Sequence, residues 1–174
     1  TGLHIVVCPR KPQLAEHVSP KAFGRTVEQL STMYDFVVVD TTSHLTESVQ
    51  TALELADIIL LVTTQELPSI KSCNLFLNLA KASGLTNRIL FVMNRYDKRK
   101  TITPERISES LKHPVIATIL QDDIVITQSI NRGVPFILEY KNQPIGKSFQ
   151  NLVDIVIQRT EPRVTSEKET PNKV

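Results

Sequence analysis

Short apolar segments, each about as long as one buried β-strand, recur along this chain and alternate with segments of helical periodicity. Within the apolar segments polar and apolar residues do not alternate, which indicates strands that are covered on both faces of a sheet. This order of strands and helices predicts an α/β fold, a three-layer sandwich in which helices lie on both faces of a mostly parallel sheet. The predicted strands are residues 3–9, 36–40, 57–64, 88–94 and 114–120.

The predicted helices begin and end at residues with suitable capping chemistry. Ser19-Pro20 and Thr103-Pro104 each place an N-cap hydroxyl before a proline at the first helical position. Asp122 or Asp123 is expected to cap a later helix. Gly84 and Gly133 are placed to end two helices. The other predicted helices cover about residues 47–56, 68–83 and 145–159.

The composition is that of an ordinary globular domain. The chain has 174 residues, of which 41% are hydrophobic and 22% are charged, so one domain is expected. A net charge of +2 gives no electrostatic reason to expect nucleic-acid binding. No apolar run approaches the roughly 18 residues that span a bilayer. Cys8 and Cys73 predict neither a disulfide framework nor a metal cluster, so a reducing cytoplasm is the expected compartment.

The two ends of the sequence lead to separate predictions, an internal start within a longer protein and a disordered C-terminal tail. No initiator Met opens the chain, and a strand of the buried type begins two residues in, so Thr1 is interpreted as an internal position. Residues 161–174 are polar and lack periodicity, and they are predicted to form a disordered tail. Residues 1–160 are then the domain.

Asp40 ends the apolar run FVVVD and is predicted to lie at the carboxyl end of a buried strand, where α/β sheets bind ligands. A carboxylate there costs desolvation free energy unless a cation or N–H donors meet it. One interpretation is that it holds Mg²⁺ through water, as a Walker B aspartate does. The other is that Asp40 caps the following helix or closes a turn with Thr42. The loop able to sense a terminal phosphate would be Thr41, Thr42, Ser43 and His44.

Four stretches, in order, resemble the MinD/ParA group of P-loop ATPases, and in particular its CpaE/TadZ-like branch, which is associated with pilus assembly and polar placement. They cover about residues 34–156. LHIVVCPRKP would match the strand that precedes Walker B. The resemblance implies a P-loop NTPase-like fold and makes residues 1–160 part of a nucleotide-binding domain. The stretches are YDFVVVD, ALELADIILLVTTQELPSIKSCNLFLNLAK, ILFVMNRYD and TILQDDIVITQSINRGVPFILEYKNQPIGKSFQNLV.

The resemblance also implies roles for individual residues. Asp40 matches the Walker B aspartate that orders Mg²⁺ through water, and residues 41–44 match switch II. Thr42 stands where the family usually has proline, which is a departure from the usual switch sequence.

A second group of residues matches the family's adenine site. Asn94 matches an asparagine that contacts the adenine ring, and Arg95 lies beside it. Gln121 and Asp122 fall in the loop that closes over the base, although Leu120 stands where the family often has proline. From the local sequence alone, Asn94 is equally well explained as a turn residue that bonds its own backbone.

The phosphate-binding loop of that family is absent from this sequence. No GxxxxGK motif followed by Ser or Thr occurs, and all five glycines are isolated. Such a loop needs glycines so that backbone N–H groups can approach the phosphates, and a lysine to neutralise them. In the resembled family it lies upstream of the strand that opens this chain. We therefore expect ATP and Mg²⁺ to bind the parent protein, and this chain alone to bind ATP poorly and not to hydrolyse it. Without the upstream strand, residues 36–40 and 57–64 would have unpaired edges, which predicts poor solubility.

Three functions follow from the resemblance. The first is a nucleotide-dependent switch, in which ATP closes a homodimer that positions a membrane-associated pilus or secretion machine or another polar machine. Such a switch would be cytoplasmic, and it could lie peripherally at the inner face of the membrane or at a cell pole. Residues 65–79 and switch II would form the partner face. The second is a degenerate, non-hydrolysing localisation scaffold. The third is a tyrosine autokinase of the capsule-regulating type. Such proteins usually carry a cluster of tyrosines in the C-terminal tail, and the absence of tyrosine after Tyr140 counts against this function.

Overall fold

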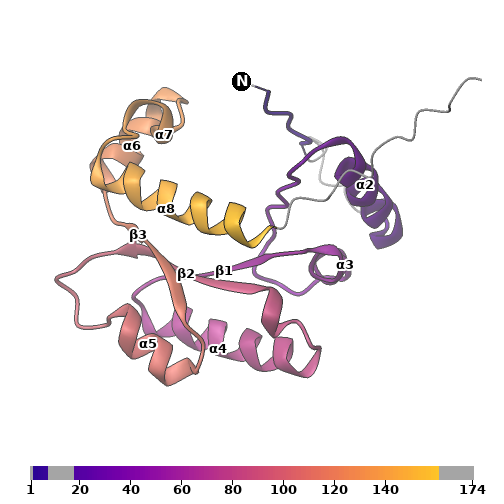
Figure 1. The fold of residues 1–174 in the computed structure, drawn as a ribbon, viewed down its shortest axis with the longest axis horizontal. Helices are drawn as coiled ribbons and strands as arrows, with labels where there is room; N and C mark the ends of the chain where they lie inside the picture. Colours follow the sequence, from indigo (N-terminus) through magenta and orange to yellow (C-terminus); the bar gives the residue numbers. More distant parts are fainter. Residues whose placement is uncertain (1, 8–17, 161–174) are drawn as a thin grey trace, which may run out of the picture. The chain divides into compact units, whose positions relative to one another are not determined.

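The structure is a computed structural model that describes residues 2–7 and 18–160. The chain divides into two compact units, Thr1–Asp57 and Ile58–Val174, which are described separately. Figure 1 labels the helices and strands of both units. The predicted tail, residues 161–174, lies outside the described residues.

The first unit contains helix α2 (Pro20–Met33) and helix α3 (Glu47–Leu55). The predicted cap of α2 is confirmed, because Ser19 Oγ accepts a hydrogen bond from Ala22 N at 3.2 Å. The two helices pack closely at Gly24, where a Cβ atom would lie 3.0 Å from Thr51 Cγ2. A glycine at this position therefore allows the helices to approach each other.

Two of the predicted strands are wrong in the residues that the structure describes. Residues 3–7 and 36–40 form no strand, while residues 8 and 9 lie outside the described part. Apolar composition indicates that a segment tends to be buried, but a strand also needs a neighbour that completes its hydrogen bonds. Neither segment has such a neighbour among the described residues, and most of their side chains are exposed, with Val38 at 90% and Val7 at 77%.

The second unit is built on a parallel sheet of three strands in the order β1-β2-β3. Helices α4 and α5 make the crossovers that parallel strands require. The three strands agree with the predictions at 57–64, 88–94 and 114–120. The elements are β1 (Ile59–Thr63), α4 (Leu67–Ala82), the 3₁₀ helix η1 (Thr86–Arg88), β2 (Ile89–Tyr96), α5 (Pro104–Leu111) and β3 (Val115–Leu120).

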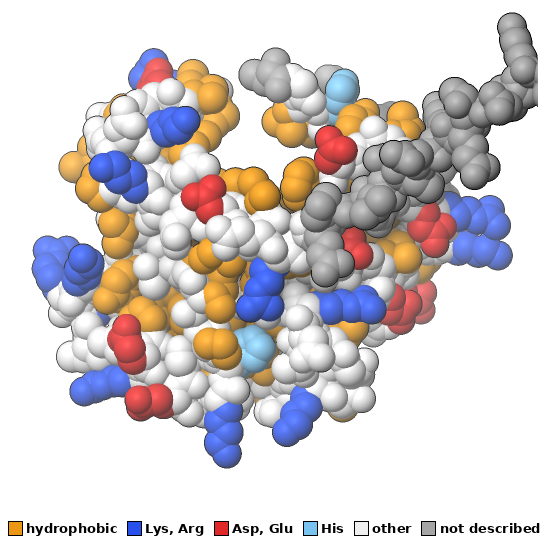
Figure 2. Space-filling model, in the orientation of Figure 1, with side chains coloured by type: hydrophobic (Ala, Val, Ile, Leu, Met, Phe, Trp, Pro, Cys, Tyr) orange, Lys and Arg blue, Asp and Glu red, His pale blue; other side chains and the backbone are white. Residues whose placement is uncertain are grey.

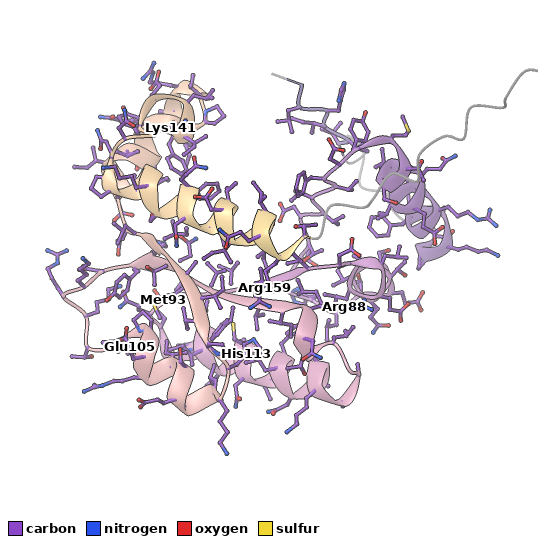
Figure 3. All side chains as sticks on the ribbon, in the orientation of Figure 1. Arg88, Met93, Glu105, His113, Lys141 and Arg159 are labelled. Carbon is purple, nitrogen blue, oxygen red and sulfur yellow. The ribbon has the colours of Figure 1, made fainter. Side chains whose placement is uncertain are left out.

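Helices cover both faces of this sheet (Figure 1), which confirms the predicted α/β class. On one face, Phe91 and Met93 of β2 pack with Cys73 of α4 and Ile107 of α5. Figure 3 shows Met93 on that side of the sheet. On the other face, residues of β2 and β3 pack against Leu152 of α8 (Pro144–Arg159). Alternate residues of β2 thus enter opposite cores, as the absence of polar alternation predicted.

Two helices stand between β3 and α8, namely α6 (Asp123–Arg132) and α7 (Phe136–Glu139). The predicted end of α6 is confirmed, because Gly133 has a φ of 62° in the left-handed region. Helix α7 was not predicted, because four residues are too few to show helical periodicity.

Some apolar side chains of the second unit reach the surface. In β1, Leu60 and Val62 are 44% and 50% exposed. In α4, Leu67, Leu75 and Leu79 are each more than half exposed. Figure 2 shows hydrophobic side chains among the charged ones on one face. Among the described residues, no helix combines the length and the apolar character needed to cross a membrane.

Candidate functional site

The four residues expected at the base site lie at the carboxyl ends of two neighbouring strands. Asn94 and Arg95 lie near the carboxyl end of strand β2, and Gln121 and Asp122 follow β3 directly. The backbone N–H of Gln121 donates to Tyr96 O at 3.0 Å and joins the two strand ends. The topology of the second unit therefore brings together two pairs of residues that are more than 25 positions apart in sequence.

A bulge in β2 changes the direction of the chain at Asn94 and Arg95. Met93 pairs with Thr118 and Tyr96 with Leu120, so two residues of β2 stand opposite one residue of β3. Arg95 has a φ of 54°, which is unfavourable for a residue with a side chain. The Oδ1 of Asn94 accepts from Arg95 N at 2.8 Å and supports this conformation.

The side chain of Asn94 can serve two purposes at once. Its Oδ1 bonds its own backbone, as the turn interpretation predicts. Its Nδ2 makes no hydrogen bond to any described residue, and the side chain is half-buried. An amide with a free donor and a second oxygen lone pair is complementary to the N7 acceptor and N6 donor of adenine. The chemistry of this residue therefore fits an adenine base.

Asp122 and Asp123 have different roles beside it. Asp122 Oδ1 accepts from Val125 N at 3.0 Å and so caps α6, one of the two predicted caps. Asp123 was not predicted as a site residue. Its Oδ2 accepts from Gln121 Nε2 at 2.7 Å, and its Oδ1 lies 3.5 Å from Arg95 Nη2. Because the Arg95 and Asp123 side chains are 62% and 65% exposed, this pair orients the two groups and adds less than about 1 kcal/mol.

The loop after β2 is organised around Asp97. Its carboxylate accepts from the backbone N–H of Arg99 at 3.0 Å, from Arg99 Nε at 2.9 Å and from Arg99 Nη2 at 2.7 Å. The hydrogen bonds from Arg99, with smaller charge contributions from Arg99 and Lys100, lower the pKa of Asp97 from 3.8 to about 2. Arg99 is therefore held against its own loop.

The residues expected to bind Mg²⁺ and to form switch II lie in the first unit. Asp40 is exposed, and Thr42 Oγ1 donates to His44 O at 3.4 Å. The alternative that Asp40 caps the following helix is wrong, because Thr46 caps α3 and accepts from Val49 N at 3.3 Å. Within the described ranges, no group of three or more His, Cys, Asp or Glu side chains could hold a metal ion. Asp40 offers one carboxylate, and its role toward Mg²⁺ stays a prediction.

Comparison with known proteins gives no match to a family model. Septum site-determining protein MinD of Thermotoga maritima is 29% identical over 143 residues, which are 79% of this chain and 52% of that protein. A putative MinD of Emiliania huxleyi is 30% identical over 145 residues, 80% of this chain and 52% of that protein. The chain therefore spans about half the length of the curated relatives that it matches.

Solved structures show the same relationship in three dimensions. The cell division ATPase MinD of Pyrococcus furiosus has a TM-score of 0.72 and 25% identity, over 86% of this chain and 63% of that one. In sequence and in fold, this chain is similar to the MinD/ParA family of P-loop ATPases. MinD of Pyrococcus horikoshii, solved with Mg-ADP, has a TM-score of 0.69 and 26% identity, over 84% and 60% of the two chains. A ParA family ATPase of Chlorobium tepidum has a TM-score of 0.75, with 23% identity over 86% and 60%.

These similarities confirm the MinD/ParA resemblance that was stated from the sequence. The relatives are MinD proteins, and one of the MinD structures contains Mg-ADP. The assignment to the CpaE/TadZ branch and the roles of individual residues stay predictions.

Proposed function

We propose that residues 1–160 are part of a MinD/ParA-type nucleotide switch, in which Mg-ATP closes a homodimer that positions a pilus, secretion or other polar machine. The observation that carries the proposal is the junction of Asn94, Arg95, Gln121 and Asp122 at one edge of a parallel sheet. In open α/β folds ligands bind at this edge. The sequence and fold similarity to MinD, including a MinD solved with Mg-ADP, supports a nucleotide as that ligand.

Each group of residues has a part in this switch. Asn94 Nδ2 donates to the adenine ring, and Gln121 and Asp122 belong to a loop over the base. Asp40 holds Mg²⁺ through water, and residues 41–44 respond to the terminal phosphate. The phosphates need a glycine-rich loop that this sequence does not contain, so the proposal requires that a longer product of the gene supply it.

The proposed partner face includes the start of α4. Leu67, Leu75 and Leu79 are 63%, 66% and 54% exposed on this helix, which gives residues 65–79 an apolar surface suited to protein partners. If these partners belong to a membrane-associated machine, the protein would attach peripherally to the inner face of the membrane or lie at a cell pole.

A second candidate is a localisation scaffold that dimerises without hydrolysing ATP. It is favoured by Thr42 and Leu120, which replace two prolines that the family often has. The tyrosine autokinase alternative has no support beyond the sequence around Asp40.

Calorimetric titration of the complete gene product with Mg-ATP, Mg-ADP and Mg-GDP tests the base site. Loss of one hydrogen bond predicts that Asn94→Ala weakens adenine-nucleotide binding about tenfold. Asn131→Ala is the matched control, because Asn131 is exposed on α6 and lies outside the site. Equal affinity of Asn94→Ala and the parent protein for ADP would contradict the base role.

The metal role and turnover need separate measurements. Asp40→Ala is expected to lose the Mg²⁺ dependence of ATP binding and to abolish nucleotide-dependent dimerisation measured by light scattering. Phosphate release by the parent protein separates the two functions, since a switch turns over ATP and a scaffold does not. A complete protein that binds no nucleotide would exclude the switch.

A further inference from the structure

Gln65 is a buried polar residue between β1 and α4, and its side chain is only 5% exposed. Its Oε1 accepts from Asp97 N at 2.7 Å, and its Nε2 donates to Asp97 O at 3.2 Å and to Ile102 O at 2.7 Å. The side-chain amide thus pairs with both backbone groups of Asp97, as a neighbouring strand would. Its third bond reaches the far end of the same loop.

These bonds determine the course of the loop from Asp97 to Ile102. The loop is polar and exposed between its two ends, so it has little apolar burial of its own to order it. If the Gln65 amide were removed, the N–H of Asp97 and the carbonyls of Asp97 and Ile102 would each lose a hydrogen-bond partner. Leaving such groups unpaired is costly in a low-dielectric interior. Gln65 therefore fixes both ends of the loop with one side chain.

Ser69 in the first turn of α4 holds the end of β1 in place. Its Oγ accepts from Thr64 N at 3.0 Å and lies 3.1 Å from Thr63 Oγ1. The backbone that carries Gln65 is thereby tied to α4. The amide is presented to the loop from a fixed position.

The same loop adjoins the base site. Asp97 directly follows Tyr96, whose carbonyl accepts from Gln121 N at 3.0 Å, and Tyr96 directly follows the Asn94–Arg95 bulge. Hydrogen bonds thus run from Gln65 at the end of β1, through the backbone of Tyr96 and Asp97, to the start of the β3–α6 loop. The carboxyl ends of three strands are joined in this way.

We propose that Gln65 is a positioning residue that holds the Asn94–Arg95 bulge and Gln121 in the arrangement of the base site. As a statement about nucleotide binding it rests on the proposed function. As a statement about the geometry of the bulge it can be tested without nucleotide. This role could not be predicted from the sequence, because the partners of Gln65 lie 32 and 37 residues away.

Amide hydrogen exchange of the full chain by NMR tests the geometry. In Gln65→Ala, exchange of the Asp97 amide is expected to become about tenfold faster or more, as its hydrogen bond is lost. The Arg95 and Gln121 amide resonances should shift as well, while the amides of Val92 in the buried strand stay protected. Gln128→Ala is the matched control, since Gln128 is exposed on α6. Unchanged Arg95 and Gln121 resonances in Gln65→Ala would overturn the proposal.

Gln65→Glu separates the hydrogen bond that Oε1 accepts from the two hydrogen bonds that Nε2 donates. It also covers the case in which Gln65→Ala does not fold. When ionised, the new carboxylate can accept from Asp97 N but cannot donate to Asp97 O or Ile102 O. When protonated, it regains one donor. Protection of the Asp97 amide in this variant should therefore recover in part as the pH falls, whereas the parent chain should show no such recovery. A variant that behaves like the parent at every pH would count against the donor bonds.

Mg-ADP titration of the complete protein keeps the two claims apart. If the parent protein binds Mg-ADP, Gln65→Ala should weaken binding about as much as Asn94→Ala, and normal affinity would overturn the positioning role. If the parent protein does not bind Mg-ADP, the proposed function fails, and the NMR comparison still decides whether Gln65 holds the bulge.

Discussion

Gly146, in the first turn of α8, is a position where two physical effects predict opposite results. A Cβ atom at this buried glycine would lie 2.7 Å from Lys141 O and 2.9 Å from Lys141 C, and nearer still to Tyr140 O. Figure 3 labels Lys141 in the segment that leads into α8. All three atoms belong to the backbone, so no side chain can rotate to make room. Gly146→Ala must therefore displace the start of α8 or the chain before it.

The sign of the effect follows from the magnitudes. Alanine is favoured over glycine by about 1 kcal/mol within a helix, and by less in its first turn. Overpacking against rigid neighbours costs about 1–3 kcal/mol, and three backbone contacts argue for the upper part of that range. We expect Gly146→Ala to lower the free energy of unfolding by about 2 kcal/mol.

The displacement should also reach the proposed base site. Ser148, in the same part of α8, accepts from Leu120 N at 3.2 Å and donates to Ile145 O at 2.7 Å. Leu120 is the last residue of β3 and directly precedes Gln121. Movement of the helix start would release this N–H, so exchange of the Leu120 amide should become faster in Gly146→Ala.

Urea unfolding of the full chain, followed by far-ultraviolet circular dichroism, measures the change in stability. Lys147→Ala is the control, because Lys147 is exposed in the same turn and should change stability by no more than about 0.5 kcal/mol. If Gly146→Ala is as stable as the parent chain or more stable, helix propensity outweighs the contacts and the reasoning is refuted.

Two further predictions concern the loop after β2 and the core. Arg99→Ala removes the main hydrogen bonds to Asp97, so the pKa of Asp97 should rise from about 2 toward 3.8, as a carboxyl ¹³C titration would show. Because folding lowers this pKa, the Asp97 carboxylate stabilises the parent chain above about pH 4, and this stabilisation is lost as the pH falls through about 2. An unchanged pKa of Asp97 in Arg99→Ala would contradict the assigned cause. Phe91→Ala should cost about 3–5 kcal/mol, because Phe91 is 0% exposed between α4 and α5, whereas Leu75→Ala at a 66% exposed position should cost little. Equal urea midpoints for Phe91→Ala and Leu75→Ala would contradict the assignment of this core.

Interactions over a few residues could be predicted from the sequence. Ser19, Thr103 and Asp122 cap their helices as expected, and Gly133 ends α6 in the left-handed conformation. The partners in these motifs lie three or four residues away, so that local geometry decides them. The capping alternative for Asp40 failed because Thr46, closer to the start of α3, takes that position.

The residues of the proposed base site could be named in part from the sequence, and their role toward a base stays a prediction. Asn94, Arg95, Gln121 and Asp122 were identified through a family resemblance, and the structure places them together. Asp123 was missed, because its contact with Arg95 spans 28 residues. A residue type gives no information about such a contact until the fold brings the two segments together.

The sequence by itself determined the α/β class, the three strands of the sheet and most helix boundaries, because hydrophobic periodicity and capping act within a few residues. Only the tertiary structure decided that residues 3–7 and 36–40 are not strands, since a strand depends on a neighbour elsewhere in the chain. Only the tertiary structure placed Gln65 against Asp97 and Ile102, because hydrogen bonds of a buried amide are set by the segments that fold around it.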